Sequence, residues 1–470
     1  MGRKACVVGA GPNGLAAAIV LAQAGLHVDV LEAQPTLGGA VRTLELTLPG
    51  FHHDFGSAVY PLGAGSPFFS SLPLRDHGLE WIHSPAALAH PLDDGTAVLL
   101  ERDLDRTVQA LGEDGTAWNN LTRPFVENWA AFAPEVLAPV SFFPSHPLLM
   151  ARFGAVGFRS ARSVAQRFRS KRTKALWAGL AAHSFLSLDE PLSAAFALMM
   201  AVPAHAVGWP IPRGGAQSLT KALCGFLGTF SSTLKTSSPV EDLVDLEGYD
   251  LILCDVTPRQ LLKIGKKKLT AEYQQQLEKF QYGSAVFKVD YALSSPIPWK
   301  APSCLEAATV HIGGSLEEIA QSEEVVRRGR HADRPFVLLA QPSLFDTSRA
   351  TAGKHTAWAY CHVPHGSKVD MLGKLENQIE RYAPGFRECV LARNIFSPAN
   401  LESMDGNLIG GDINGGMMDI RHFLARPTCR RYATSARDVY ICSSSTPPGG
   451  GVHGMCGYHA AKMALKNSRI

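Results

Sequence analysis

The start of the chain constrains the fold more than any other stretch, because it has the pattern of a dinucleotide-binding βαβ unit. Residues 4–8 form an apolar run typical of a buried strand, and GAGPNG follows with the spacing G-x-G-x-x-G. A helix rich in small residues is predicted over 15–24, and a second strand over 26–31. Strand, glycines, helix and second strand occur in the order that such a unit requires.

Each glycine of the motif has its own expected role. Gly9 allows the tight turn, Gly11 lets the backbone approach a pyrophosphate, and Gly14 lets helix and strand pack closely. The start of the helix then presents free N–H groups and a positive dipole end to the phosphates. Glu32 ends the second strand and is placed to accept hydrogen bonds from an adenosine ribose, which disfavours a 2′-phosphate and hence NADP.

Composition narrows the class of protein. A chain of 470 residues predicts two domains, and 45 basic against 42 acidic residues give no sign of nucleic-acid binding. Nine cysteines without a C-x-x-C pair favour a reducing compartment and argue against a dithiol centre. No apolar run reaches the ~18–20 residues that span a bilayer. We expect a cytoplasmic protein, because removing the N-terminus as a signal peptide would destroy the glycine motif.

Two further segments extend the nucleotide motif. LGGAVRT contains Gly38, Gly39 and Arg42, and HDFGSAVYP contains Gly56 and Ser57. With the first motif, these segments resemble the superfamily of FAD-dependent amine oxidases and phytoene desaturases, the GR2-type flavoproteins. The resemblance implies that the glycine pair continues the pyrophosphate site of FAD.

The C-terminal segment resembles the same superfamily. Residues 443–445 (SSS) precede PPGGGVHGM, and a loop of this kind lies along the isoalloxazine ring in that superfamily. A glycine-rich loop that meets a helix N-terminus also suits a ring carbonyl that gains negative charge. In the superfamily, a valine matching Val240 meets the adenine. Here the segment between Val240 and Leu251 is shorter than in relatives.

These motifs predict FAD, bound non-covalently, and no metal. His453 and Cys456 are the only candidates near the ring for a covalent link, and no attachment sequence surrounds them. The predicted cofactor-binding residues are Gly9, Gly11, Pro12, Asn13, Gly14, Glu32, Ala33, Gly38, Gly39, Arg42, Gly56, Ser57, Val240, Ser444, Gly451, Val452, His453, Gly454 and Met455.

The resulting fold class is α/β, a Rossmann-like FAD-binding domain of GR2 type with an inserted α+β substrate domain. The FAD-binding domain is predicted in three parts, over 1–75, 208–265 and 426–470. The substrate domain is predicted in two parts, mostly helical over 76–207 and a sheet with helices over 266–425.

Within the substrate domain, a hairpin is predicted over 88–100, with further strands over 282–293, 306–312, 335–341 and 355–363. Residues 105–185 are predicted to be mostly helical. Ser315 and Glu318 form a capping box that starts one helix, and another is predicted near 371–382.

Three classes of function fit these motifs. We favour a desaturase-like oxidoreductase that oxidises or isomerises a small apolar organic substrate by hydride transfer to flavin, with oxygen or a quinone as electron acceptor. A flavin amine oxidase is the second class. The third is a flavin-fold binding or assembly protein with little turnover. A disulfide reductase is excluded, since there is neither a second nucleotide motif nor a C-x-x-C pair.

Lys288 and His453 are the predicted catalytic residues. The strand GSAVFKVDYAL resembles one on which amine oxidases carry a lysine that holds water against the flavin. Strand alternation places Val286, Lys288 and Asp290 on one face, so Lys288 can point at a cavity and help oxygen activation. The alternative is a surface lysine paired with Asp290.

Peripheral membrane contact is a further expectation. Residues 159–174 hold seven cations among sixteen residues, and the apolar block 191–202 is closed by Pro203. A membrane-surface helix would have this basic pattern, and the alternative is a solvated basic helix face. The apolar block is interpreted as core or cavity wall, with a membrane-dipping segment as its alternative.

Overall fold

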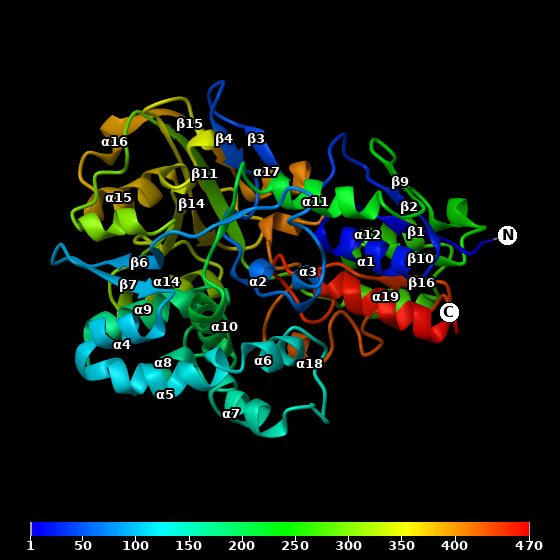
Figure 1. Ribbon diagram of the computed structural model, residues 1–470, viewed down its shortest axis with the longest axis horizontal. Coiled ribbons are helices and arrows are strands. Elements are labelled where there is room, and N and C mark those ends of the chain that lie inside the picture. The colour runs from blue at the N-terminus through cyan, green and yellow to red at the C-terminus, as the bar shows by residue number, and fades with distance from the viewer. Residues whose placement is uncertain (1, 470) are drawn as a thin grey trace.

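The computed structural model describes residues 2–469. Its first layer is a five-stranded sheet in the order β16-β10-β1-β2-β9, in which every pairing is parallel (Figure 1). The order joins distant parts of the chain, since β10 lies beside the N-terminal strand β1 and β16 lies beside β10. The strands are β1 (Lys4–Val8), β2 (His27–Leu31), β9 (Ser232–Lys235), β10 (Leu251–Cys254) and β16 (Val439–Ile441).

Helices cover both faces of this sheet, as an all-parallel sheet requires. On one face, α1 (Pro12–Gln23), α11 (Gln217–Leu227) and α19 (Met455–Asn467) pack in one apolar core with β1 and β2. On the other face lie α12 (Pro258–Gly265) and α13 (Ala271–Glu278). The Rossmann-like fold class predicted from the sequence is therefore confirmed.

Helix α1 begins at Pro12, three residues before the predicted start, since proline is well suited to the first turn of a helix. Gly9 has a φ of 99°, which favours glycine and makes the tight turn. A Cβ on Gly14 would lie 2.1 Å from the carbonyl oxygen of Gly9, so the predicted close packing of strand and helix requires glycine there.

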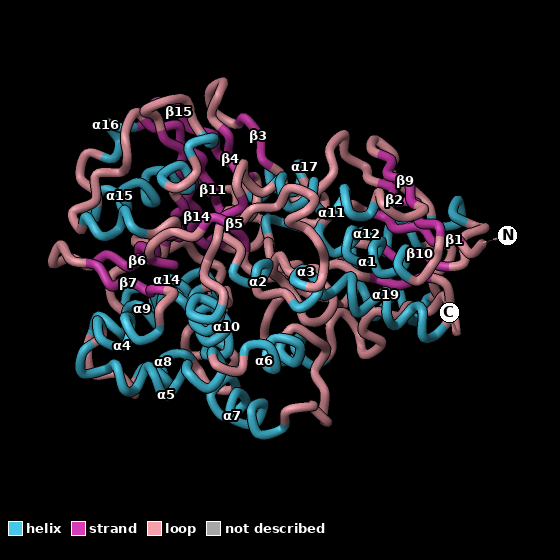
Figure 2. Tube along the Cα trace, viewed as in Figure 1, coloured by secondary structure: helices cyan, strands magenta, loops and turns pink. Residues whose placement is uncertain are grey.

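The second layer is a seven-stranded mixed sheet in the order β15-β11-β14-β13-β12-β6-β7. In Figure 2 its strands form a magenta group separate from that of the parallel sheet. Its strands are β6 (Ala86–Pro91), β7 (Ala97–Glu101), β11 (Ala285–Leu293), β12 (Thr309–Ile312), β13 (Val337–Ala340), β14 (His355–Val363) and β15 (Val390–Phe396).

One row of this sheet matters for the site. The pairing register aligns His311, Leu338, Tyr360 and Lys288 across β12, β13, β14 and β11. Side chains that are paired directly across neighbouring strands point to the same face, so these four share one face. The helices α9 (Lys171–Ala182), α10 (Ser193–Ala206) and α14 (Leu316–Arg327) pack on that face, and α15 (Leu372–Tyr382) packs on the other.

The predicted helical region forms a third layer, seen as a cyan group at the lower left of Figure 1. Besides α9 and α10 it contains α4 (Leu104–Ala110), α5 (Gly115–Val126), α6 (Trp129–Val136), α7 (Pro147–Gly157) and α8 (Ala161–Ala165). The remaining short elements are β3 (Thr43–Glu45), β4 (His52–Asp54), α2 (Pro61–Ala64), α3 (Pro67–Ser70), β5 (Trp81–Ile82), β8 (Ile211–Pro212), α16 (Phe386–Cys389), α17 (Pro398–Met404) and α18 (Ile420–Leu424).

Two sequence-based expectations in this layer are wrong. Pro203 does not close the apolar block, because α10 continues through it to Ala206. The basic stretch 159–174 is not one helix, since α8 ends at Ala165 and α9 starts at Lys171 with Ser170 as its cap. Most of α10 is buried, in agreement with the interpretation as core or cavity wall. Strand β15, at the edge of the large sheet, is an element that the sequence analysis did not identify.

The strands of the parallel sheet come from the three intervals assigned to the FAD-binding domain, and those of the large sheet from the two assigned to the substrate domain. The exact boundaries stay a prediction. Among residues 2–469, no helix is both long and apolar enough to cross a membrane.

Candidate active site

A cavity of about 870 Å³ joins the two sheets. Val8, Leu31 and Asp255 line it, and they stand at the carboxyl ends of β1, β2 and β10. Ligands of open α/β sheets bind at this edge. The same cavity reaches the face of the large sheet that carries Lys288 and Tyr360.

The glycine loop at the start of α1 has the features of a phosphate site. Gly11 is the cap residue of the helix and provides no side-chain cap, Pro12 has no N–H, and the N–H of Gly14 donates to Asp255, so the N–H of Asn13 is the group of the first turn that is left for an anion. A Cβ on Gly39 would lie 3.3 Å from the Cα of Gly11, so the second glycine turn packs directly on the first. Asn13 is buried and its Oδ1 has no partner among the described residues.

Glu32 lines the cavity and also accepts two hydrogen bonds from the protein backbone. Its Oε2 accepts a hydrogen bond from the N–H of Ala10 at 2.8 Å, and its Oε1 accepts one from the N–H of Gln34 at 2.9 Å. The carboxylate therefore braces the glycine loop. The sequence analysis did not predict this structural role. The contact of the same oxygens with a ribose stays a prediction.

Arg42 is buried and joins three segments around the cavity. Its Nε donates to the carbonyl oxygen of Gly39 at 2.6 Å, and its Nη2 donates to that of Met404 at 2.9 Å. Burial lowers its pKa, while nearby Asp405 and Glu32 act in the opposite direction. Its cation thus offsets carboxylates at the edge of the site.

Asp255 is a site residue that the sequence analysis missed. Its Oδ2 accepts a hydrogen bond from the N–H of Gly14 at 2.8 Å, directly beneath the glycine loop. Burial raises its pKa to about 7, and the charges of Asp405 and Glu32 act in the same direction. The sequence does contain a signal that could have identified Asp255, because it is an acidic residue directly after a predicted buried strand. Asn407 was also missed, and it donates from Nδ2 to the carbonyl oxygen of Asp255 at 2.9 Å.

The C-terminal loop enters the cavity through Ser444 and residues 450–453. Gly451 has a φ of 120°, which favours glycine. Burial lowers the pKa of His453 to about 4, so its ring is neutral at physiological pH. Its Nδ1 accepts a hydrogen bond from the N–H of Met455 at 3.0 Å, which leaves the proton on Nε2.

The structure brings most predicted cofactor residues to one cavity but not all. Those in the lining are Gly9, Gly11, Pro12, Asn13, Glu32, Ala33, Gly39, Arg42, Gly56, Ser57, Val240, Ser444, Gly451, Val452 and His453. Gly14, Gly38, Gly454 and Met455 lie behind the lining. Gly454 is tightly packed, since a Cβ there would lie 2.5 Å from the ring of Phe69, so its role is to shape the loop.

Lys288 lies in the cavity wall and is buried, so the alternative of a surface lysine is wrong. Its expected pairing with Asp290 does occur, with 2.5 Å between Nζ and Oδ1. The ammonium group lies 5.5 Å from the ring centre of Trp358 and 5.4 Å from that of Phe396. Burial raises the pKa of Asp290, and His53 stands 4.0 Å away with its pKa lowered to about 3 by burial.

The rest of the cavity is an apolar chamber. Its walls come from the large sheet, from α10 and from the segment around α7. The sequence indicated α10 as a possible wall and predicted that Lys288 on β11 points at a cavity, but it did not single out the segment around α7. Chamber residues include Phe153, Phe185, Met199, Met200, Trp209, Leu338, Trp358 and Tyr360. No group of three or more His, Cys, Asp or Glu residues suited to a metal occurs in the described part of the chain.

This arrangement defines a class of protein. A phosphate-binding glycine loop at the carboxyl edge of a parallel sheet opens into a large apolar chamber, as in a dinucleotide-dependent oxidoreductase. Residues 7–70 match the family described as NAD(P)-binding Rossmann-like domain.

Comparisons along the full chain narrow this class. The chain is 26% identical to pyridine nucleotide-disulfide oxidoreductase domain-containing protein 2 of Rattus norvegicus, covering 98% of this chain and 93% of that protein. It is 24% identical to the all-trans-zeta-carotene desaturase of Myxococcus xanthus, covering 96% and 90%. A solved structure of putrescine oxidase shares the fold, with a TM-score of 0.58, 17% identity and coverage of 100% and 98%.

Along its whole length the chain is therefore similar to desaturases of carotenoids, and it shares its fold with an amine oxidase. This confirms the resemblance inferred from the sequence motifs.

Proposed function

We propose that the protein is an FAD-dependent oxidoreductase that removes a hydride from an apolar substrate, with oxygen or a quinone as final acceptor. The observation that carries the proposal is the continuity of one cavity, lined at one end by the glycine loop and at the other by the apolar chamber. A desaturase needs this arrangement, because the cofactor and the substrate carbon atoms must meet away from water.

The residues present fit FAD. The open helix start at Gly11 and the adjacent turn at Gly39 suit the two phosphates, and Glu32 suits the ribose. Bound FAD would supply the hydride acceptor. Asn13 has an orphaned buried Oδ1 that a bound group could satisfy.

The chain's own groups orient and shield the reaction. His453 stays neutral, with its proton on Nε2 next to the backbone carbonyls of Gly449 and Gly450, so it shapes the loop without adding charge. Lys288 holds a cation at the chamber wall, which favours nearby negative charge. The aromatic walls exclude water.

An anaerobic substrate screen tests the function. Polyenes and amines are added to the FAD-loaded protein as separate panels, and bleaching of the flavin band is followed. We expect bleaching by polyenes. Leu338 lies in the chamber wall, so Leu338→Trp should abolish bleaching while the FAD content stays unchanged. Equal bleaching in that variant would show that the chamber is not the substrate site.

An amine oxidase is the second candidate. The buried Lys288 favours it, since the sequence around this residue resembles the amine oxidase strand, and the fold is shared with putrescine oxidase. Bleaching by amines and not by polyenes would favour this candidate. A flavin-fold binding or assembly protein would respond to neither panel.

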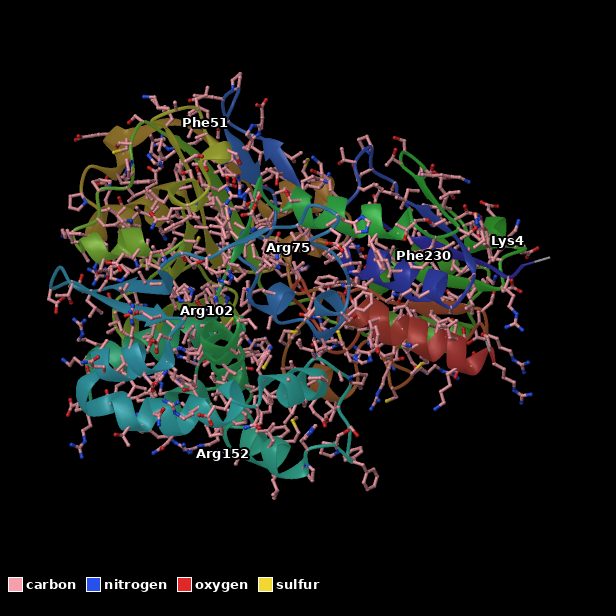
Figure 3. The ribbon with its side chains drawn as sticks, in the orientation of Figure 1. Lys4, Phe51, Arg75, Arg102, Arg152 and Phe230 are labelled. Atoms are coloured by element: carbon pink, nitrogen blue, oxygen red, sulfur yellow. The ribbon has the colours of Figure 1, made fainter. Side chains whose placement is uncertain are left out.

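We also propose peripheral membrane contact, at a different place from the one that the sequence suggested. Phe142, Phe143 and Leu148 are 87%, 93% and 87% exposed. Along the chain they alternate with Ser141, Pro144 and Met150, which line the cavity, so a cavity mouth at this segment is part of the proposal. Arg152, labelled in Figure 3 on the outer side of the helical layer, adds a cation nearby. A lipid surface suits this combination, because apolar substrates dissolve in bilayers.

A further inference from the structure

Four histidines gather beside the apolar chamber. His90 on β6, His311 on β12 and His362 on β14 belong to the large sheet, and His183 directly follows α9. The Nε2 atoms of His183 and His311 lie 3.0 Å apart. Gly179 makes room for this cluster, since a Cβ there would lie 2.9 Å from Nδ1 of His311 and 3.2 Å from Nδ1 of His90.

Burial keeps the central pair neutral. It lowers the pKa of His183 to about 3 and that of His311 well below its usual value. Two neutral rings that share one hydrogen bond have one donor and one acceptor at Nε2. The Nδ1 atom of His183 is therefore a donor in one tautomer of the pair and an acceptor in the other.

His183 is the member of the pair that reaches the cavity. It lines the chamber and is partly accessible, whereas His311 is fully buried behind it. The ring of Trp209 stands 5.8 Å away and holds that of His183 edge-on. Because Nε2 of His183 is engaged by His311, Nδ1 is the ring nitrogen left for a ligand.

A second polar group opens into the same chamber. Thr309 lies two residues before His311 on the same face of β12, lines the cavity and is 1% exposed. Its Oγ1 has no hydrogen-bond partner among the described residues. A buried hydroxyl without a partner costs free energy, so a ligand group that pairs with it gains affinity.

The acidic groups near this end are already engaged. Glu323 pairs with His362 at 2.7 Å, and Asp290 pairs with Lys288. Asp290 and the Oε2 of Glu323 thus each have a partner before a ligand binds. A neutral ligand group is favoured over a carboxylate or an ammonium, since burying an unpaired charge is costly.

We propose that His183 and Thr309 bind one neutral oxygen function, a hydroxyl or a carbonyl, of an otherwise apolar substrate. The inference rests on the proposed function in taking the chamber as the substrate site. His311 is then a positioning residue, because its Nε2 holds the Nε2 of His183 and so orients the ring.

Calorimetric binding of three ligands of equal length tests the proposal. Dodecane, 1-dodecanol and dodecylamine are titrated into the FAD-loaded protein. We expect 1-dodecanol to bind about tenfold more tightly than dodecane, as one buried hydrogen bond gives. Thr309→Val and His183→Phe should each remove most of this preference. Thr356→Val is the matched control, because Thr356 is equally buried, has an unpartnered Oγ1 and lies outside the cavity lining.

The outcomes are distinct. Equal binding of 1-dodecanol and dodecane by the unaltered protein would overturn the inference. So would a loss of the preference for 1-dodecanol in Thr356→Val as large as that in Thr309→Val. Tightest binding of dodecylamine, or no binding of any of the three ligands, would also overturn it. A chain that prefers 1-dodecanol but holds no FAD would contradict the proposed function and leave the oxygen-binding pair supported.

Discussion

Lys288 and Asp290 form a buried ion pair on one face of strand β11, with 2.5 Å between Nζ and Oδ1. Side chains two residues apart in a strand share a face, so the pair is a consequence of strand geometry. The lysine lines the cavity, and its partner Asp290 is fully buried. Lys288 is therefore held at a defined position without needing a ligand.

Replacing this lysine should affect the oxidative half-reaction. In Lys288→Met, we expect reoxidation of the reduced flavin by oxygen to slow far more than flavin reduction, because a cation stabilises negative charge that develops there. Stopped-flow absorbance measures both rates. Lys279→Met, which changes an exposed lysine outside the cavity lining, is the control. A reoxidation rate equal to that of the unaltered protein would make Lys288 a structural residue.

Asp255 should make FAD binding depend on pH. Its pKa of about 7 in the folded protein lies above the ordinary 3.8, so the proton is held more tightly after folding. The resulting stabilisation is complete below about pH 4 and is lost as the pH rises through about 7. Ionised Asp255 would also repel phosphates, so FAD affinity should fall between about pH 6 and 8.

Asp255→Asn isolates this effect, because the amide oxygen can still accept from the N–H of Gly14. We expect FAD affinity, measured by quenching of flavin fluorescence, to become nearly independent of pH across the same range. The exposed Asp245→Asn serves as control. If the pH dependence persists in Asp255→Asn, another group is responsible.

Glu32→Ala should weaken FAD retention. The variant loses the carboxylate that braces Ala10 and Gln34, and charge-assisted hydrogen bonds contribute about 1.5–3 kcal/mol each. The ratio of flavin to protein absorbance after desalting measures occupancy, with the exposed Glu247→Ala for comparison. Undiminished occupancy would remove Glu32 from the ribose role.

FAD should be released by acid. Cys456, one of the two residues that the sequence predicts near the ring as candidates for a covalent link, is buried, lies outside the cavity lining, and its Sγ donates to backbone oxygens of Thr446 and Gly449. After acid precipitation we expect the yellow colour in the supernatant. Colour retained in the pellet would show a covalent bond.

Membrane contact should depend on the exposed residues at the cavity mouth. Changing Phe142, Phe143 and Leu148 together to serine should lower the bound fraction in liposome flotation at least tenfold, since full burial of each side chain is worth about 1.5–3 kcal/mol. The control variant carries glutamine at Lys171 and Arg172, in the basic stretch, and its bound fraction should stay close to that of the unaltered protein. No flotation of the unaltered protein at low salt would reject the proposal.

Local sequence determined the nucleotide half of the protein. The spacing of Gly9, Gly11 and Gly14 requires one backbone path, because a Cβ at Gly14 would collide with the carbonyl of Gly9. Strand alternation likewise determined that Lys288 and Asp290 share one face. Such patterns depend only on residues a few positions apart, and the order of these residues is given by the sequence itself.

The tertiary structure alone decided what these local elements meet. Asp255 lies 241 positions from Gly14 along the chain, yet it accepts that residue's N–H, and His183 meets His311 across 128 positions. The burial of Lys288, the opening of Thr309 into the chamber and the exposure of Phe142 all depend on how the two sheets and the helical layer pack. No local pattern encodes these features, because burial and partner choice arise from contacts between segments distant in sequence.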